Sequence, residues 1–173
     1  MTSSILTTHV GSLPRSKELS ELLFAKDKKE TFNEKTFEFE VKKNVENVVK
    51  KQLEVGIDII SDGEMSKISY ATYIKDRLKG FSGESERKAP ADLDAFDEYK
   101  IKIAKSGGTP TYVRPCCTSE LEIQDEESLK LDIKNFTDSL KKFNHTDGFM
   151  NSASPGVINI FMPTNFIKTM MNI

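Results

Sequence analysis

Two short polar segments carry side chains that could bind or act on a small molecule. The first, THVGSLPR at residues 8–15, places Gly11 next to Ser12. A glycine lets a ligand approach the backbone, and a serine offers both an N–H and a hydroxyl group. The pair therefore suits capture of a carboxylate or an amino-acid backbone. An ordinary tight turn explains the same residues, and a lone histidine such as His9 is more often structural than a ligand.

The second segment is Ser-Asp-Gly-Glu at residues 61–64, directly after a short β-branched run. Asp62 and Glu64 are two carboxylates two positions apart, which could hold an ammonium group or act as a general base. The alternative is that Asp62 caps a following helix and Glu64 sits in the first turn of that helix. The residues themselves favour neither interpretation.

The cysteines form a third candidate. Cys116 and Cys117 are adjacent, which is poor geometry for a disulfide and does not match the C-x₂₋₄-C spacing of structural zinc sites. Free cysteines are among the most buried residue types, so we expect both to be small buried apolar residues. The other histidine, His145, stands in a polar loop and receives no role.

The elements that must position these residues alternate between strands and helices. Strands are expected at residues 5–10, 57–60, 111–118 and 149–152, and helices at residues 16–29, 37–55, 70–78 and 128–143. The second helix has a possible capping box at Thr31 and Glu34 and a glycine just past its end, Gly56. Residues 81–110 are polar and broken by Gly and Pro, which is typical of an excursion, a segment that leaves the fold and is not a core element. Alternating βα units predict an α/β fold with a parallel sheet and a ligand site where the strands end.

Composition sets the remaining limits. The chain has 173 residues and a formal net charge of −2, which suits one domain over residues 1–173 and shows no basic stripe for nucleic acid. No apolar run approaches the ~18 residues of a membrane span, and no secretory signal is visible at the N-terminus. We therefore expect a cytoplasmic protein that binds neither nucleic acid nor membrane.

Three segments together resemble one family. TTHVGSLPRS, KKQLEVGIDIISDGEMSK and FMNSASPGVINIF are similar to the N-terminal half of the catalytic barrel of cobalamin-independent methionine synthases and their short single-barrel relatives. The resemblance extends over nearly all of the chain, and the segment around Asp62 and Glu64 is its most specific part. It implies a parallel (β/α)8 TIM barrel of which the first four βα units are present.

The resemblance also implies an activity. Family members transfer a methyl group to the thiol of homocysteine, with a zinc ion that binds the sulfur as thiolate. Carried over residue by residue, Val10, Gly11 and Ser12 contact the amino-acid end of homocysteine and Glu64 holds its ammonium group. His9 and Asp62 are possible further contacts. The zinc ligands of the family are expected beyond residue 173, and the methyl donor is a folate or a methylated corrinoid.

Two other readings stay open. The chain could be an alkyltransferase of the same fold that acts on another thiol, such as coenzyme M with epoxides. It could also be an inactive truncated half-barrel, because half a barrel exposes unpaired strand edges and is expected to self-associate through them.

Overall fold

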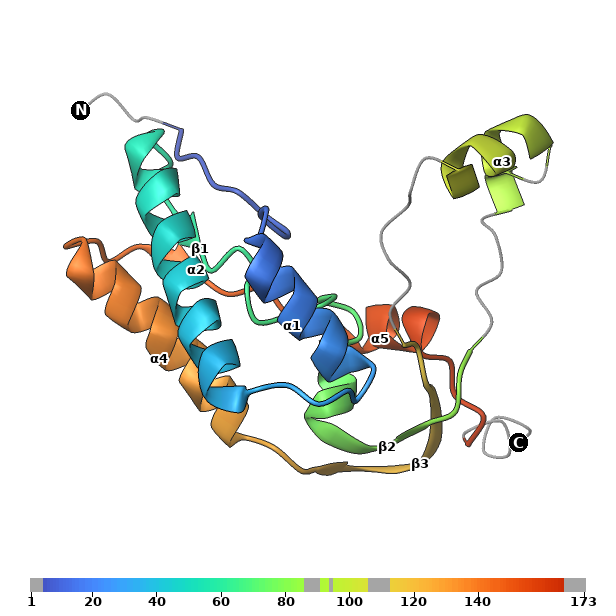
Figure 1. Ribbon diagram of the computed structural model, residues 1–173. Coiled ribbons are helices and arrows are strands. Elements are labelled where there is room, and N and C mark those ends of the chain that lie inside the picture. The colour runs from blue at the N-terminus through green and yellow to red at the C-terminus, as the bar shows by residue number, and fades with distance from the viewer. Residues whose placement is uncertain (1–4, 86–90, 94, 106–112, 167–173) are drawn as a thin grey trace.

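The computed structural model describes residues 5–85, 91–93, 95–105 and 113–166 (Figure 1). Its helices are α1 (Lys17–Asp27), α2 (Glu34–Glu54), α3 (Asp97–Lys105), α4 (Glu127–Lys142) and α5 (Pro155–Phe161), with short 3₁₀ turns η1 (Tyr73–Asp76) and η2 (Ala91–Leu93). Its strands are β1 (Ile60–Ser61), β2 (Leu78–Ser82), β3 (Cys116–Ile123) and β4 (Gly148–Phe149). None of the helices in these ranges has both the length and the apolar character of a membrane span.

The helices α1, α2 and α4 build the apolar core over the short parallel strands. The buried apolar side chains recur along one face of α2 and meet those of α1, α4 and β1. They are Leu19, Leu23, Phe37, Val41, Val45, Val49, Ile60, Met65, Phe136 and Leu140. The long amphipathic helix predicted after residue 31 is therefore confirmed.

The ends of α2 show one wrong and one correct prediction. The side chain of Asn33 accepts the Thr36 backbone N–H at 3.0 Å, so the N-cap is Asn33 and the capping box at Thr31 and Glu34 is wrong. Asn33 takes the N-cap position because its side-chain oxygen accepts a hydrogen bond from an N–H group of the first turn. At the other end, Gly56 follows the C-cap with φ +82°, as the C-terminal glycine was expected to do.

Three chain segments run parallel and side by side. Ile60 and Ser61 of β1 pair with Gly148 and Phe149 of β4, and Thr8 forms a parallel bridge to Ile59. The predicted strands at residues 5–10 and 149–152 are thus represented by a single bridge and by a two-residue strand one position earlier. The parallel arrangement of these three segments is confirmed. The described residues do not form a closed barrel.

The strand predicted at residues 111–118 is present, but its main pairing is not the expected one. Cys116–Ile123 pairs antiparallel with Leu78–Ser82. In the described part of the chain its parallel pairing is limited to one bridge, from Cys117 to Thr164, so the region forms a two-stranded ribbon instead of the third βα unit. Residues 111 and 112 lie outside the described part. The helix expected at residues 70–78 is likewise only η1 followed by β2. Apolar and β-branched runs indicate a strand but not its partner, and Gly80, at φ +99°, suits the irregular ribbon better than a helix.

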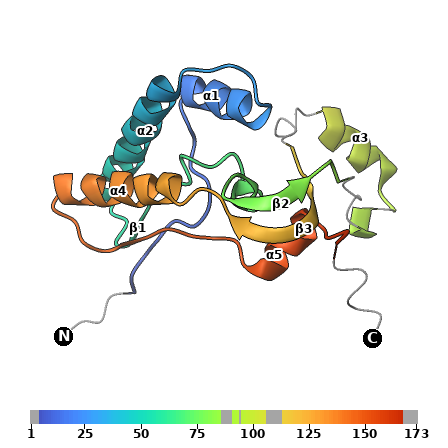
Figure 2. The same cartoon turned by 90° about the horizontal axis from the view of Figure 1, so that it is seen from below.

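The ribbon lies apart from the helical core. Figures 1 and 2 show β2 and β3 beside one another, to one side of α1, α2 and α4, with α3 beyond them. In β3 only Cys116 and Cys117 are buried, and its six remaining residues are exposed. The excursion predicted over residues 81–110 is confirmed in the sense that its described residues contribute nothing to the core cluster.

Candidate functional site

The carboxylate of Glu64 lies at the centre of a polar group formed where the parallel segments end. The Ser12 hydroxyl donates to Oε2 of Glu64 at 2.5 Å, and the Asn151 side-chain amide donates to Oε1 at 2.5 Å. Ser12 follows the Thr8 segment, Glu64 follows β1 and Asn151 follows β4. Three segments far apart in sequence therefore meet at the carboxylate of Glu64, a residue that is 1% exposed as a whole.

The backbone around Glu64 is tightly constrained. Gly63 has φ +60°, and a Cβ on it would lie 2.9 Å from the Met65 side chain and 3.1 Å from that of Leu13. The Gly63 carbonyl also accepts the Leu13 N–H at 3.0 Å, which joins the two site segments. Glu64 itself has φ +58°, an unfavourable conformation for a residue with a side chain. Such strain is often found at functional sites.

Arg15 fixes the turn that carries Glu64. Its Nη2 donates to the carbonyl oxygen of Glu64 at 2.8 Å and to that of Lys67 at 2.6 Å. Burial lowers the pKa of the Arg15 guanidinium, while the nearby Glu64 and Asp62 oppose that change. Arg15 therefore acts on the loop backbone and leaves the two oxygens of the Glu64 carboxylate to Ser12 and Asn151.

Lys67 and Asp62 form a second buried layer. The Lys67 ammonium donates to the Asn151 carbonyl at 3.0 Å and lies 3.6 Å from an Asp62 carboxylate oxygen. The other Asp62 oxygen accepts the Glu64 N–H at 3.2 Å. Burial raises the pKa of Asp62, and Lys67 opposes the rise. Asp62 thus supports the Glu64 turn from within instead of capping a helix, because no helix begins there.

The remaining predicted residues divide into two groups. Val10 is exposed, and a Cβ at Gly11, whose φ is +103°, would meet no atom within 4 Å, so there is open space for a ligand beside these residues. His9 instead lines a separate apolar hollow with Pro14 and Val48, and its Nε2 has no hydrogen-bond partner in the described part of the chain. The structure thus brings Ser12, Asp62 and Glu64 together and places His9 elsewhere.

Sequence reasoning missed three contributors, namely Arg15, Lys67 and Asn151. Asn151 had a usable signal, because it follows a predicted strand, and polar residues at the ends of parallel strands are where ligands bind in such folds. Arg15 and Lys67 had none, since each acts through backbone carbonyls that only the tertiary structure brings within reach.

The described residues supply no metal centre. Within residues 5–85, 91–93, 95–105 and 113–166, no group of three or more His, Cys, Asp or Glu side chains is placed to hold an ion. Cys116 and Cys117 are free and buried, in agreement with their predicted apolar role. The residues present in these ranges therefore do not form a zinc site.

The family model and the known proteins similar to this chain describe cobalamin-independent synthases and homocysteine methyltransferases. The model of the cobalamin-independent synthase catalytic domain matches residues 5–95. A 5-methyltetrahydropteroyltriglutamate–homocysteine methyltransferase of Bifidobacterium longum is 35% identical over 75 residues, which are 43% of this chain and 10% of that protein. One of Buchnera aphidicola is 32% identical over 76 residues, again 43% and 10%. The matched part is thus about a tenth of these relatives.

A solved structure extends the similarity of fold. The B12-independent methionine synthase from a Shewanella species, solved with selenomethionine, matches with a TM-score of 0.59 and 19% identity, over 94% of this chain and 41% of that one. At this identity the match shows the fold alone, an α/β arrangement like that of the solved protein. The sequence match from residue 5 to residue 95 covers more than half of the chain, and we conclude that the chain belongs to the family of the cobalamin-independent synthase catalytic domain.

Proposed function

We propose that this chain binds homocysteine for methyl transfer to its thiol, as part of a barrel of the TIM type. The observation that carries the proposal is the Glu64 carboxylate, held by Ser12 and Asn151 where three parallel segments end. In such folds this end is where ligands bind. The activity named for the family's curated relatives, homocysteine methyltransferase, supports the same substrate.

Glu64 is proposed to accept the ammonium group of the substrate. An ionised carboxylate has about four lone-pair positions on two oxygens. Ser12 and Asn151 use one on each oxygen and orient the carboxylate, which leaves acceptor capacity for an ammonium group. Hydrogen bonds between two charged groups are stronger than neutral ones, so this contact would dominate recognition of the amino-acid end.

Val10, Gly11 and Ser12 are proposed to contact the same end of the substrate. The open space beside Gly11 leaves room for a carboxylate to approach the backbone. Asp62 is assigned to support of the Glu64 turn, and His9 is not included because it lines the separate apolar hollow.

The thiol half of the reaction is not assigned to the described residues. Zinc, when bound, would supply a thiolate at neutral pH, but the described side chains do not form a site for it. The methyl donor, a folate or a methylated corrinoid, is likewise left to an activity assay.

Titration calorimetry on the full chain tests the proposal. L-homocysteine is compared with 4-mercaptobutyrate, which has the same chain without the amino group, and with coenzyme M. We expect homocysteine to bind at least about tenfold more tightly than either, because each charge-assisted hydrogen bond contributes about 1.5–3 kcal/mol. Glu64→Gln should remove this preference, and the matched surface variant Glu54→Gln should keep it. Equal binding of homocysteine and 4-mercaptobutyrate by the unaltered chain would contradict the proposal. Preference for coenzyme M would favour the other thiol alkyltransferase.

Self-association through open strand edges is part of the same proposal. The parallel segments at Thr8 and β4 each pair on one side only within the described residues. Unpaired edges are templates for association. Light scattering at micromolar concentration should therefore report species larger than a monomer. A monodisperse monomer would contradict this part and leave the homocysteine proposal intact.

A further inference from the structure

Lys67 joins the three segments that meet at the Glu64 carboxylate. Its backbone carbonyl accepts a hydrogen bond from Nη2 of Arg15, which follows the Thr8 segment, at 2.6 Å. Its ammonium donates to the carbonyl oxygen of Asn151, which follows β4, at 3.0 Å. Its own N–H donates to the carbonyl oxygen of Glu64, in the turn after β1, at 3.0 Å. One residue therefore links the ends of the three parallel segments.

The Lys67 ammonium is buried among polar and aromatic groups. The side chain is 6% exposed, and its ammonium lies 3.6 Å from an Asp62 carboxylate oxygen and 5.5 Å from the centroid of the Tyr73 ring. Lysine is almost never buried unless it is paired, because an ammonium group loses much hydration energy on burial. Asp62 and Tyr73 keep the charge in place, so the ammonium holds the Asn151 carbonyl in one position.

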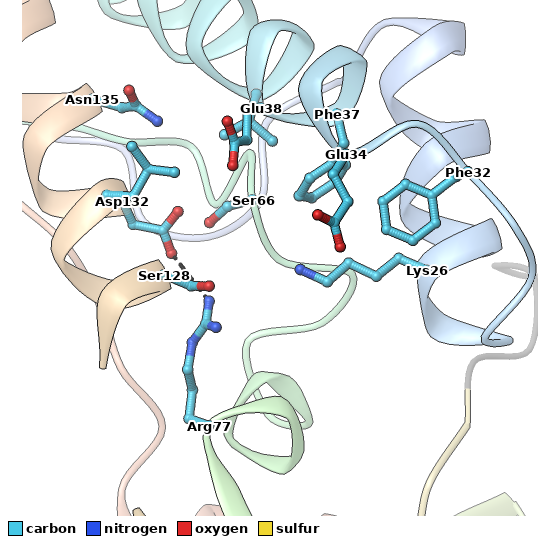
Figure 3. Close-up of a pocket in the computed structure, with 12 residues that line it drawn as sticks. Lys26, Phe32, Glu34, Phe37, Glu38, Ser66, Arg77, Ser128, Asp132 and Asn135 are labelled. Carbon is cyan, nitrogen blue, oxygen red and sulfur yellow. Dashed lines mark ion pairs between the residues drawn. The ribbon is translucent and has the colours of Figure 1, made fainter. Parts of the chain in front are cut away.

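The loop that carries Lys67 has apolar support at one point. Met65 packs in the core cluster, whereas Ser66 borders a cavity of about 190 Å³ that is lined mainly by residues of α2 and α4 (Figure 3). Neither Glu64 nor Lys67 lines this cavity. Because dense packing ends at Ser66, the position of the next residue depends on its polar contacts.

The position of the Asn151 backbone determines where its side-chain amide can reach. That amide donates to Oε1 of Glu64 at 2.5 Å, while the Lys67 ammonium holds the carbonyl oxygen of the same residue. Asn151 lies between β4 and α5, outside regular secondary structure, so neither a helix nor a strand fixes its backbone. The two contacts at Asn151 thus form a path from Lys67 to the Glu64 carboxylate.

We propose that Lys67 is a positioning residue for the candidate homocysteine site. It fixes Asn151, and Asn151 in turn orients the Glu64 carboxylate for the ammonium group of the substrate. Lys67 acts through Asn151 and is not itself a ligand of the substrate. The inference rests on the proposed function for the identity of that substrate, whereas the contact between Asn151 and Glu64 can be measured in the free protein.

The side-chain amide of Asn151 tests this path without any ligand. In the unaltered chain we expect NMR to show one amide proton protected from exchange with solvent, because it donates to the buried Glu64 carboxylate. Lys67→Met removes the ammonium, keeps a long side chain and should speed this exchange at least about threefold. Lys75→Met, which removes another buried, paired ammonium at the base of the ribbon, is the matched control and should leave the exchange unchanged.

Binding measurements extend the test to the substrate. Titration calorimetry on the full chain gives the preference of each variant for L-homocysteine over 4-mercaptobutyrate. Lys67→Met should lower this preference at least about threefold, and Lys75→Met should keep it. Asn151→Leu removes the side-chain amide but keeps the carbonyl that Lys67 holds. The double variant should lose no more preference than Asn151→Leu alone, because Lys67 acts through that amide.

Three results would overturn the inference. One is unchanged exchange of the Asn151 amide in Lys67→Met. Another is an equal effect of Lys67→Met and Lys75→Met, which would assign the change to a general loss of stability. The third is additive losses in the double variant, which would show that Lys67 does not act through the Asn151 amide.

The two measurements also separate this inference from the proposed function. If the unaltered chain does not prefer homocysteine, the proposed function fails, and the exchange measurement still supports or refutes the role of Lys67 in holding Asn151. Far-ultraviolet circular dichroism checks that each variant is folded. If Lys67→Met does not fold, Lys67→Gln, which still offers an N–H donor to Asp62, takes its place.

Discussion

The helical layer over the parallel strands and the β2–β3 ribbon are stabilised by different interactions. The layer buries a continuous apolar cluster along α1, α2 and α4. The ribbon buries little beyond Cys116 and Cys117 and exposes Leu121 and Ile123. A two-stranded ribbon is marginal in water on its own, so this one needs support from elsewhere.

That support comes from charged groups at the base of the ribbon. The Lys75 ammonium pairs with the Asp27 carboxylate at the end of α1, and both side chains are buried, at 8% and 2% exposure. Arg77, just before β2, pairs with Asp125 and donates to the Tyr73 hydroxyl at 2.7 Å.

Tyr73 in turn donates to Asp132 on α4. Burial, and then Asp132, raise the pKa of Tyr73, so its hydroxyl remains a donor at neutral pH. A polar region outside the core can thus be fixed to it by a few buried ion pairs and hydrogen bonds. Loss of one of these interactions should lower the free energy of unfolding more than loss of any exposed contact in the ribbon.

The largest expected effect is the loss of the buried ion pair. Lys75→Met leaves the Asp27 carboxylate buried without its cation, and breaking a buried pair costs about 3–5 kcal/mol. Urea unfolding should show this loss of free energy. Lys79→Met, which removes one partner of the exposed 3.6 Å pair with Glu122, should cost less than about 1 kcal/mol. Equal effects of the two changes would show that the base of the ribbon is not held by its buried charges.

Truncation of matched leucines compares the two regions directly. Leu19 is completely buried in the core, whereas Leu121 in the ribbon is 50% exposed. Leu19→Ala should lower the free energy of unfolding by about 2–5 kcal/mol and Leu121→Ala by less than about 1 kcal/mol. The measurement is again denaturant unfolding. A cost for Leu121→Ala as large as that for Leu19→Ala would mean that the ribbon surface is covered in solution.

A glycine substitution tests whether the ribbon is disrupted alone. A Cβ at Gly80 would lie 2.6 Å from the Glu120 carbonyl oxygen, and its φ of +99° is unfavourable for alanine. Gly80→Ala should cost about 1–3 kcal/mol and raise amide hydrogen exchange in β2 and β3 but not in α2. Gly83→Ala, where φ is +68° and no atom lies within 4 Å, separates the backbone strain from the clash. Faster exchange throughout α2 would show that the two regions unfold together.

The smallest expected effect depends on pH. Hydrogen bonds from Ser128, and then the charge of Arg77, lower the pKa of Asp125. A folded-state pKa below the unfolded value near 3.9 means that Asp125 stabilises the fold above that pH and that this contribution is lost as the pH falls through the lowered value.

Asp125→Ala should therefore cost about 1 kcal/mol at pH 7, because it removes the acceptor of the Ser128 N–H and hydroxyl in the first turn of α4, and it should cost less at pH 3. Unfolding free energies at the two pH values give the comparison, and Asp125→Asn shows how much remains when only the charge is removed. A cost that does not change with pH would show that the charge of the Asp125 carboxylate does not contribute.

The sequence could predict several helices and strands and their buried faces. It predicted much less well which distant segments of the chain lie in contact. The apolar period of α2 and the glycine after its end follow from local rules, and the structure agrees with both. The strand near residue 116 was also recognised, but its partner was not, because an apolar run specifies a pleated segment without saying which edge it pairs with.

The candidate site shows the same division. The sequence identified Gly11, Ser12 and Glu64 as candidate ligand residues because each follows a strand, and the family of the chain came from the same motifs. The tertiary structure decided that Ser12 and Asn151 orient the Glu64 carboxylate and that Lys67 joins Asn151 to Asp62. Apart from the Lys67–Asp62 pair, those contacts join residues 52 to 87 positions apart. Local periodicity carries no information about such distances, so only the folded chain could determine them.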